Sequence, residues 1–309
     1  MNNESIKFSV VMPSYKLEGS FIERAIDSVL AQEYENWELL YVDDNSAGSE
    51  YKEISKRISL TYRNDERIHF IFHEDNLGAN RARNDAINAA TGEWLAMLDA
   101  DDYWDSIYLS NVAKKIASMD CALVATSMRI NNGHGWRDYP RTHEEGMVYE
   151  DAIMQNFSGG SSGACVRRDV LLEIGGFDDT LPACQDYDMF LRVCKKYPVG
   201  FCREIAVNYS EEEHERITKS IDKRVAGSLA VLDKTMADED LSMELRQEAY
   251  SRWHRRIGRM YIVSAGNGKE ARKHLRLASG LKTAILYAAS FIAPIGPYAF
   301  EVYNRIRFK

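Results

Sequence analysis

Strands and helices alternate through the first hundred residues, and this alternation constrains the fold more than any other feature. Short apolar runs predict strands at 7–12, 37–42, 68–72 and 94–98. Apolar residues at helical spacing predict helices at 20–32 and 79–90, and a polar helix is expected at about 48–58. Ser20 and Glu23 have capping-box spacing, and Pro13 is expected to close the first strand. The pattern predicts an α/β fold, a mostly parallel sheet flanked by helices.

Polar residues follow three of these strands. Pro13-Ser-Tyr15 follows the first, Asp43-Asp44 the second, and Asp99-Ala100-Asp101-Asp102 the fourth. Ligands of open α/β sheets lie outside the carboxyl ends of the strands, so one shared site is expected at this edge. Clustered carboxylates repel one another unless a cation lies among them, and Mg²⁺ or Mn²⁺ commonly bridges carboxylates to phosphates. A strand end with a solvated acidic loop is the alternative.

Several motifs in a fixed order carry a family resemblance. The segments Val10–Tyr15, Ser28–Gln32, Val42–Ser46, Asn76–Gly78, Ala82–Asn84 and Gly92–Asp102 together resemble glycosyltransferase family 2, whose fold is the nucleotide-diphospho-sugar GT-A type. The resemblance is dense over 8–105 and continues through Gly175-Gly-Phe-Asp178 and Gln185-Asp186 to about 220, with Gln185 where the family usually has Glu. It implies a catalytic domain at 1–220, divided into a nucleotide-binding half (1–105) and an acceptor half (106–220).

The resemblance also implies roles for residues of the first half. Pro13 and Tyr15 would flank a uracil ring, and Asp44 would accept a hydrogen bond from its N3–H. Arg83 would contact the base or a phosphate, and Asp99 with Ala100 would hold the nucleotide-sugar, Asp99 through the ribose or a metal-bound water. The alternatives are a helix cap for Asp44, a solvated helix position for Arg83 and a plain strand end for Pro13.

The metal ligands and the catalytic base are implied in the same way. Asp101 would ligate Mn²⁺ or Mg²⁺ on the diphosphate, with His214 as a second ligand, whereas Asp102 is expected to be structural. Asp186 would be the general base that removes the acceptor's hydroxyl proton. An exposed loop position for His214, a cap of a helix at 187–197 for Asp186, and Asp188 as a rival base are the alternatives.

The implied function is an inverting, metal-dependent glycosyltransferase. It would move a sugar from a UDP-sugar donor to a hydroxyl of a saccharide acceptor, lipid-linked and used in surface polysaccharide synthesis. A catalytically inactive nucleotide-sugar-binding or scaffold protein of the same fold is the alternative. A nicotinamide dehydrogenase does not fit, because no GxGxxG turn follows the first strand. Trp136 and Arg137, in the polar segment 131–147, are further candidates for acceptor contacts, with an ordinary surface loop as the alternative. The segment 158–163 is a candidate phosphate cradle, although it lacks the P-loop pattern.

Charge is spread unevenly along the chain. The net charge is −8, yet residues 251–309 hold 12 basic and 2 acidic side chains. Residues 283–300 carry no charge, but Pro294 and Pro297 interrupt them, so the basic helical region 221–309 is expected to lie on an anionic membrane surface without spanning it. Packing on the core or on a second subunit, in a homo-oligomer, is the alternative.

No nucleic-acid-binding motif accompanies the basic charge of the tail. Five cysteines without a CxxC pair, and an N-terminus with no signal peptide, favour a cytoplasmic protein. With the tail on a membrane surface, the expected location is peripheral, at the inner face of the membrane.

Overall fold

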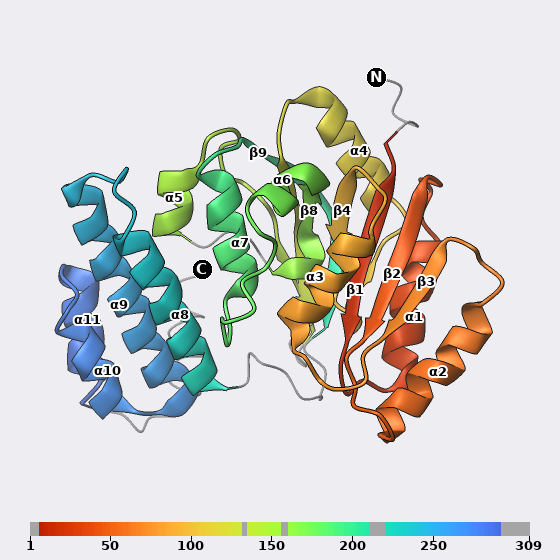
Figure 1. Ribbon diagram of the computed structural model, residues 1–309. Helices are drawn as coiled ribbons and strands as arrows, with labels where there is room; N and C mark the ends of the chain where they lie inside the picture. The colour runs from red at the N-terminus through yellow and green to blue at the C-terminus, as the bar shows by residue number, and fades with distance from the viewer. Residues whose placement is uncertain (1–5, 132–134, 156–159, 211–219, 292–309) are drawn as a thin grey trace. The chain divides into compact units, whose positions relative to one another are not determined.

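The computed structural model describes residues 6–131, 135–155, 160–210 and 220–291 (Figure 1). These residues form two compact units. The first is drawn from residues up to 215, and the second comprises residues from 216 onward together with 153–155 and 181–184.

The first unit begins with the predicted alternation. Strands β1 (Phe8–Ser14), β2 (Trp37–Asp43), β3 (Ile68–Phe72) and β4 (Trp94–Met97) pair in parallel in the order β3-β2-β1-β4. Helices α1 (Gly19–Leu30), α2 (Glu50–Tyr62) and α3 (Ala79–Ala89) connect them. The α/β alternation is therefore confirmed, and the carboxyl ends of these strands meet at one edge (Figure 1).

Two expected element ends were wrong by one or two residues. Strand β1 continues through Pro13 to Ser14, in register with β2. Pro13 is tolerated because β4 pairs with β1 only as far as Val11, so no ladder bond to β4 needs the missing N–H. Helix α1 starts at Gly19, so Ser20 lies in its first turn, and Glu18 occupies the N-cap without a side-chain hydrogen bond.

The two faces of this sheet bury different helices. Phe8, Val10 and Met12 of β1 share a core with the apolar sides of α1 and α2 and with α4 (Tyr108–Ser118). The intervening residue Val11 is also fully buried but lies outside that core, and α3 packs across β1 and β2. Successive side chains of a strand point to opposite faces of the sheet, so these continuous apolar strands pack against a helical layer on each face.

The second half of the sheet is mixed. The order continues β4-β8-β6-β9-β5 through β8 (Ala164–Arg167), β6 (Leu123–Asn131), β9 (Val199–Ser210) and β5 (Tyr103–Trp104). Strand β8 is antiparallel to both β4 and β6, whereas β9 is parallel to β6. The segment expected to be irregular contains a short strand, β7 (Trp136–Tyr139), antiparallel to β6. Helices α5 (Tyr149–Met154), α6 (Arg168–Glu173) and α7 (Gln185–Cys194) and the 3-10 turn η1 (Ser161–Gly163) complete this half.

The second unit is helical. It contains α8 (Ile221–Met236), α9 (Met243–Ala265), α10 (Gly268–Leu275) and α11 (Leu281–Ala289). The side chains of Ser220, Ser242 and Asn267 cap the first three, and Gly266 ends α9 in the left-handed conformation that glycine adopts readily. Trp253 is buried and donates from Nε1 to the Ile153 carbonyl oxygen at 2.9 Å. Within the described residues, no helix is long and apolar enough to cross a membrane.

Candidate active site

Three carboxylates gather where β4 ends. Ligand oxygens of Asp99, Asp101 and Asp102 all lie within 4.8 Å of one another. Asp102 is fully buried, whereas Asp99 and Asp101 are partly exposed. Two open carboxylates beside one fixed carboxylate suit a hard divalent cation that also needs phosphate and water ligands. The residues therefore fit the implied Mn²⁺ or Mg²⁺.

Ser162 holds this cluster in place. Its hydroxyl donates to Asp102 Oδ2 at 2.5 Å and accepts the Asp99 backbone N–H at 3.1 Å. Its carbonyl oxygen accepts from Trp104 Nε1 at 2.9 Å. The expectation of a structural Asp102 agrees with these contacts. Ser162 lies in the predicted phosphate cradle 158–163, of which 158–159 are outside the described residues, and here its side chain bonds the carboxylate cluster.

Arg83 pairs with the exposed end of the cluster. Its Nη2 lies 2.5 Å from Asp99 Oδ1, and its guanidinium lies 5.4 Å from the Phe177 ring centroid. The side chain is buried, so the alternative of a solvated helix residue is wrong. A fixed positive charge beside the carboxylates lowers the cost of holding them together and would also attract a diphosphate.

Asp186 lies in the same electrostatic neighbourhood, in the first turn of α7. Burial raises the pKa of its carboxyl group, Asp99 adds to this rise, and Arg83 and the Tyr187 backbone N–H oppose it. Because α7 already begins at Gln185, Asp186 is inside the helix and not its cap. The rival Asp188 is buried and accepts from Arg192 at 2.8 Å, which makes Asp186 the better candidate base.

Asp44 is buried, and its carboxylate accepts four hydrogen bonds. Oδ1 accepts from Leu77 N and pairs with His73 Nδ1, both at 2.8 Å. Oδ2 accepts from Gly78 N at 2.8 Å and from Asn76 Nδ2 at 2.9 Å. Ser49 caps α2, so a helix-capping role there for Asp44 is wrong. Asp44 thus fixes the turn that leads into α3, and its contact with a base stays a prediction.

The remaining predicted site residues lie in different surroundings. Tyr15 is exposed just beyond β1, with Lys16 Nζ 5.2 Å from its ring centroid, whereas Pro13 and Ala100 are buried. His214 lies outside the described residues. Tyr15 is thus the exposed one among those of them that the structure describes, and the roles given to Tyr15, Pro13 and Ala100 stay predictions.

Helix α3 holds the Gly175–Asp178 turn through two side chains to which the sequence assigned no role, those of Asn80 and Asn84. The Asn84 amide donates to the Phe177 carbonyl oxygen and accepts the Phe177 N–H, each at 2.8 Å, and Asn80 donates to the Asp178 carbonyl oxygen at 2.8 Å. Gly176 has φ +72°, and a Cβ there would lie 2.5 Å from Asn84 Oδ1. The Gly-Gly-Phe-Asp turn therefore needs glycine for both its backbone angle and its closeness to α3.

Comparison with known proteins agrees with this architecture. Residues 9–173, just over half of the chain, match the family model described as glycosyl transferase family 2. The chain belongs to this family.

Relatives within the family include bacterial glycosyltransferases. A Bacillus subtilis protein named for teichuronic acid biosynthesis, TuaG, is 33% identical over 161 residues, which cover 52% of this chain and 62% of TuaG. An Escherichia coli protein named UDP-Glc:alpha-D-GlcNAc-diphosphoundecaprenol beta-1,3-glucosyltransferase, WfgD, is 42% identical over 96 residues, covering 31% and 35%. The chain thus spans less than two thirds of the relatives' length.

Solved structures show the fold. Residues 1–349 of Staphylococcus aureus TarS in complex with UDP-GlcNAc superpose with a TM-score of 0.66 at 19% identity, covering 92% of this chain and 79% of that one. A mannosyltransferase from Pyrobaculum calidifontis in complex with GDP-Man and Mn²⁺ gives a TM-score of 0.63 at 19% identity, covering 94% and 81%. The predicted GT-A fold is confirmed.

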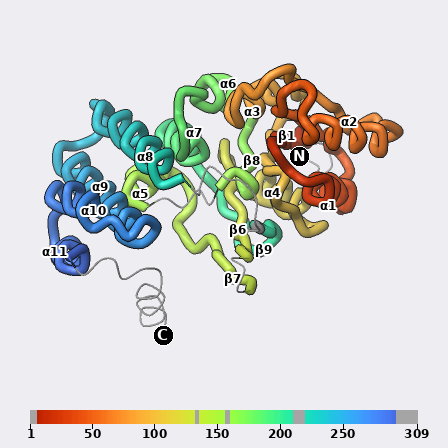
Figure 2. The backbone as a smooth tube through the Cα atoms, turned by 90° about the horizontal axis from the view of Figure 1, so that it is seen from below, coloured from red at the N-terminus to blue at the C-terminus, as the bar shows by residue number. Residues whose placement is uncertain are grey.

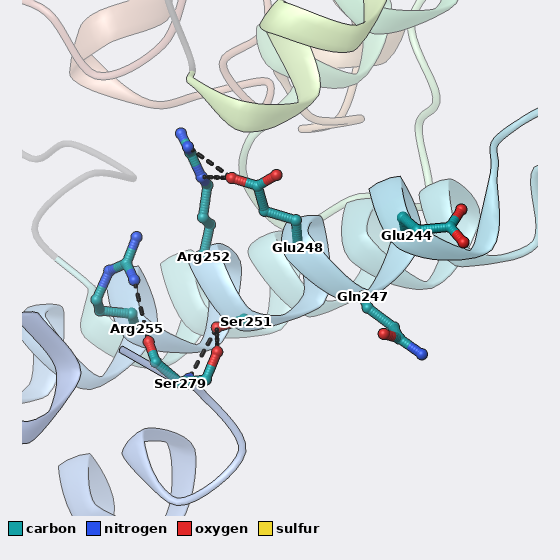
Figure 3. Close-up of a pocket in the computed structure, with 7 residues that line it drawn as sticks. All are labelled: Glu244, Gln247, Glu248, Ser251, Arg252, Arg255 and Ser279. Carbon is teal, nitrogen blue, oxygen red and sulfur yellow. Dashed lines mark hydrogen bonds and ion pairs between the residues drawn. The ribbon is translucent and has the colours of Figure 1, made fainter. Parts of the chain in front are cut away.

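A separate pocket of about 440 Å³ lies in the helical unit of this family 2 protein (Figure 3). Its polar side chains largely satisfy one another: Arg252 pairs with Glu248 at 2.7 Å, and Ser251 bonds Ser279. It brings together no set of three metal ligands. The chemistry is therefore assigned to the carboxyl edge of the sheet.

Proposed function

We propose that this protein is an inverting, metal-dependent glycosyltransferase that moves a sugar from a UDP-sugar to a hydroxyl of a saccharide. The observation that carries the proposal is the acidic cluster after β4, which Arg83 joins through its ion pair with Asp99. Asp186 takes the acceptor's hydroxyl proton while the oxygen attacks the anomeric carbon and the bond to the UDP oxygen breaks. One base supports one displacement, which inverts the anomeric centre.

Negative charge develops on the departing diphosphate, on the side of the anomeric carbon opposite Asp186, and positive groups there would stabilise it. Arg83 is fixed by its ion pair with Asp99 and supplies positive charge there. Mn²⁺ or Mg²⁺ held by Asp101 would neutralise the developing diphosphate charge, with His214 as a proposed further ligand. Because burial raises the pKa of Asp186, the base is matched to proton transfer closer to neutral pH than an exposed aspartate.

The nucleotide is proposed to lie over the carboxyl ends of β1 and β2. Tyr15 offers its exposed ring to uracil, beside Pro13 and the loop fixed by Asp44. The UDP-GlcNAc complex of TarS and the UDP-glucose named for WfgD support uridine as the nucleoside.

The acceptor is proposed to be lipid-linked, in surface polysaccharide synthesis. The diphosphoundecaprenol named for WfgD supports a lipid-linked acceptor, and the teichuronic acid biosynthesis named for TuaG supports a role in polysaccharide synthesis. Leu281, Ile285 and Phe291 on and after α11 are 79%, 57% and 62% exposed, an apolar surface that an anionic membrane would cover next to basic side chains. On this proposal 1–220 is the catalytic domain, and 221–309 holds it at the cytoplasmic face of a membrane.

Deletion of residues 281–309 tests the membrane part. The truncated chain should move from pelleted anionic vesicles to the supernatant, while the full chain stays with the vesicles. Equal distribution of the two chains would contradict the role of the tail, and a changed elution volume without vesicles would favour a second subunit.

Calorimetry tests the donor site. UDP, GDP and CMP are titrated into the wild type, Asp101→Asn and the exposed control Asp120→Asn, with and without Mn²⁺. We expect metal-dependent UDP binding in the wild type and the control, and its loss in Asp101→Asn. If all three nucleotides bound equally to every variant with and without Mn²⁺, or did not bind at all, the proposed donor site would be wrong. Asp186→Asn should keep UDP binding and lose transfer, whereas an inactive binding protein would bind UDP and show no transfer in any form.

A further inference from the structure

Two aromatic side chains, Tyr103 and the sequence-based acceptor candidate Trp136, meet beside the acidic cluster. Tyr103 opens β5, two residues after Asp101, and Trp136 opens β7. Their ring centroids lie 6.4 Å apart with the planes at 88°, an edge-to-face pair. Trp136 is 48% exposed, and Tyr103 is partly exposed. A large apolar side chain left this open next to a catalytic edge points to a ligand that covers it.

Arg24 ties this pair to the proposed metal ligand. Its Nη2 donates to the Asp101 carbonyl oxygen at 2.9 Å, and its guanidinium lies 4.7 Å from the Tyr103 ring centroid. The Tyr103 ring is therefore held by a cation and by the Trp136 ring, and its position is coupled to that of Asp101. A surface fixed in this way is preorganised for a rigid ligand and needs little ordering when it binds one.

The strand order indicates which part of a substrate can reach Trp136 and Tyr103. Along the sheet, β1 and β2 lie on one side of β4, and β6 lies on the other with β7 paired to its end. Figure 2 shows β7 extending from β6 on the side away from β1. A nucleotide over β1 and β2, with its diphosphate at the cluster after β4, leaves the β6–β7 side for the sugars.

We propose that Trp136 and Tyr103 form a stacking platform for a sugar ring of the acceptor. A pyranose ring has a face of C–H bonds with slight positive charge, which complements the negative face of an aromatic ring, and stacking also removes apolar surface of both from water. This inference rests on the proposed glycosyl transfer and makes Trp136 a determinant of acceptor binding, distinct from the donor contacts.

Saturation-transfer NMR on the full chain, with UDP and Mn²⁺ present, tests the platform. The probes are the methyl glycosides of glucose, galactose, mannose and N-acetylglucosamine. Variants are Trp136→Ala, Trp136→Phe, Tyr103→Ala and the control Tyr139→Ala, an exposed aromatic on the same strand. We expect saturation of the ring C–H protons of at least one glycoside, reduced roughly tenfold in Trp136→Ala, partly kept in Trp136→Phe and unchanged in Tyr139→Ala.

UDP binding, measured in parallel by calorimetry, separates the two ideas. If UDP binds every variant and no glycoside signal depends on Trp136, the platform is refuted while the donor site stands. If UDP affinity falls with the glycoside signal in Trp136→Ala, the ring contacts the donor, and the acceptor assignment is overturned. Absent UDP binding in the wild type defeats the proposed function itself.

Discussion

Replacing Asp44 by asparagine should destabilise the protein, because this carboxylate accepts four hydrogen bonds at the entrance to α3. An asparagine amide keeps one acceptor oxygen and presents an NH₂ group where the second oxygen was. In either amide orientation, that NH₂ group faces the backbone N–H of Leu77 or of Gly78. The side chains of His73 and Asn76 can reorient, but a backbone N–H cannot.

The magnitude follows from counting these groups. One buried backbone donor without an acceptor costs about 1–3 kcal/mol. The bonds that survive lose their ionic partner and fall from about 1.5–3 to about 0.5–1.5 kcal/mol each. With two weakened bonds to the remaining oxygen, the expected loss in the free energy of unfolding is about 3–6 kcal/mol, a large part of the ~5–15 kcal/mol typical of a folded protein.

Urea unfolding followed by circular dichroism gives the comparison, with Asp75→Asn as the control in the same loop. Asp75 is exposed, so its replacement should change stability by less than about 0.5 kcal/mol. If Asp44→Asn were as stable as Asp75→Asn, the carboxylate would not be a structural anchor. Asp44 would then act only in binding the ligand, and the loop before α3 would be held by other contacts.

Two further perturbations concern titrating groups. Because Arg83 opposes the raised pKa of Asp186, Arg83→Gln should move the acidic limb of the kcat/KM profile to higher pH. The control Arg81→Gln, on the exposed side of α3, should leave that limb in place. An acidic limb that does not move in Arg83→Gln would contradict the coupling. In the helical unit, burial lowers the pKa of His254 and His274, whose Nδ1 atoms lie 2.9 Å apart. The unfolded chain therefore takes up protons first as the pH falls below about 6.5, so stability present above that pH is lost below it. The Tm of the wild type should fall more steeply between about pH 7 and pH 5 than that of the His254→Gln, His274→Gln double variant, and parallel slopes would argue against this linkage.

The sequence predicted the first half of the fold because its signals are local. Parallel strands buried on both faces are continuous apolar runs, and each is followed by a helix with a regular apolar side. The second half of the fold has weaker local signals in the sequence. Strand β8 lies between β4 and β6 in the sheet, although it follows β6 by more than thirty residues in the chain. Nothing in its four residues indicates that antiparallel placement.

The residues of the candidate site likewise include some that local sequence predicted and others that only long-range contacts bring in. Strand ends at one edge predicted that Tyr15, Asp44 and Asp101 would share one site. The structure gathers the carboxylates that follow β4, and their sharing of a ligand with Tyr15 and Asp44 stays a prediction. The contacts of Ser162 and Arg24 with the cluster were not foreseen, because these residues reach it from 63 and 77 residues away. The segment 158–163 had been expected to bind phosphate, not to hold the carboxylates. The same holds for Asp44, whose short-range surroundings suggested a cap for α2 while its actual partners lie after β3.

Helix α3 explains how a reaction centre assembled from distant segments keeps its geometry. Arg83 faces the carboxylates, while Asn84, on the same helix, holds the Phe177 backbone across 93 residues of sequence. The Phe177 ring in turn packs against the Arg83 guanidinium. A shift of this turn would therefore move Arg83 relative to Asp99 and change the field at Asp186. The turn at 175–178 and the carboxylates after β4 are thus held in one arrangement by α3.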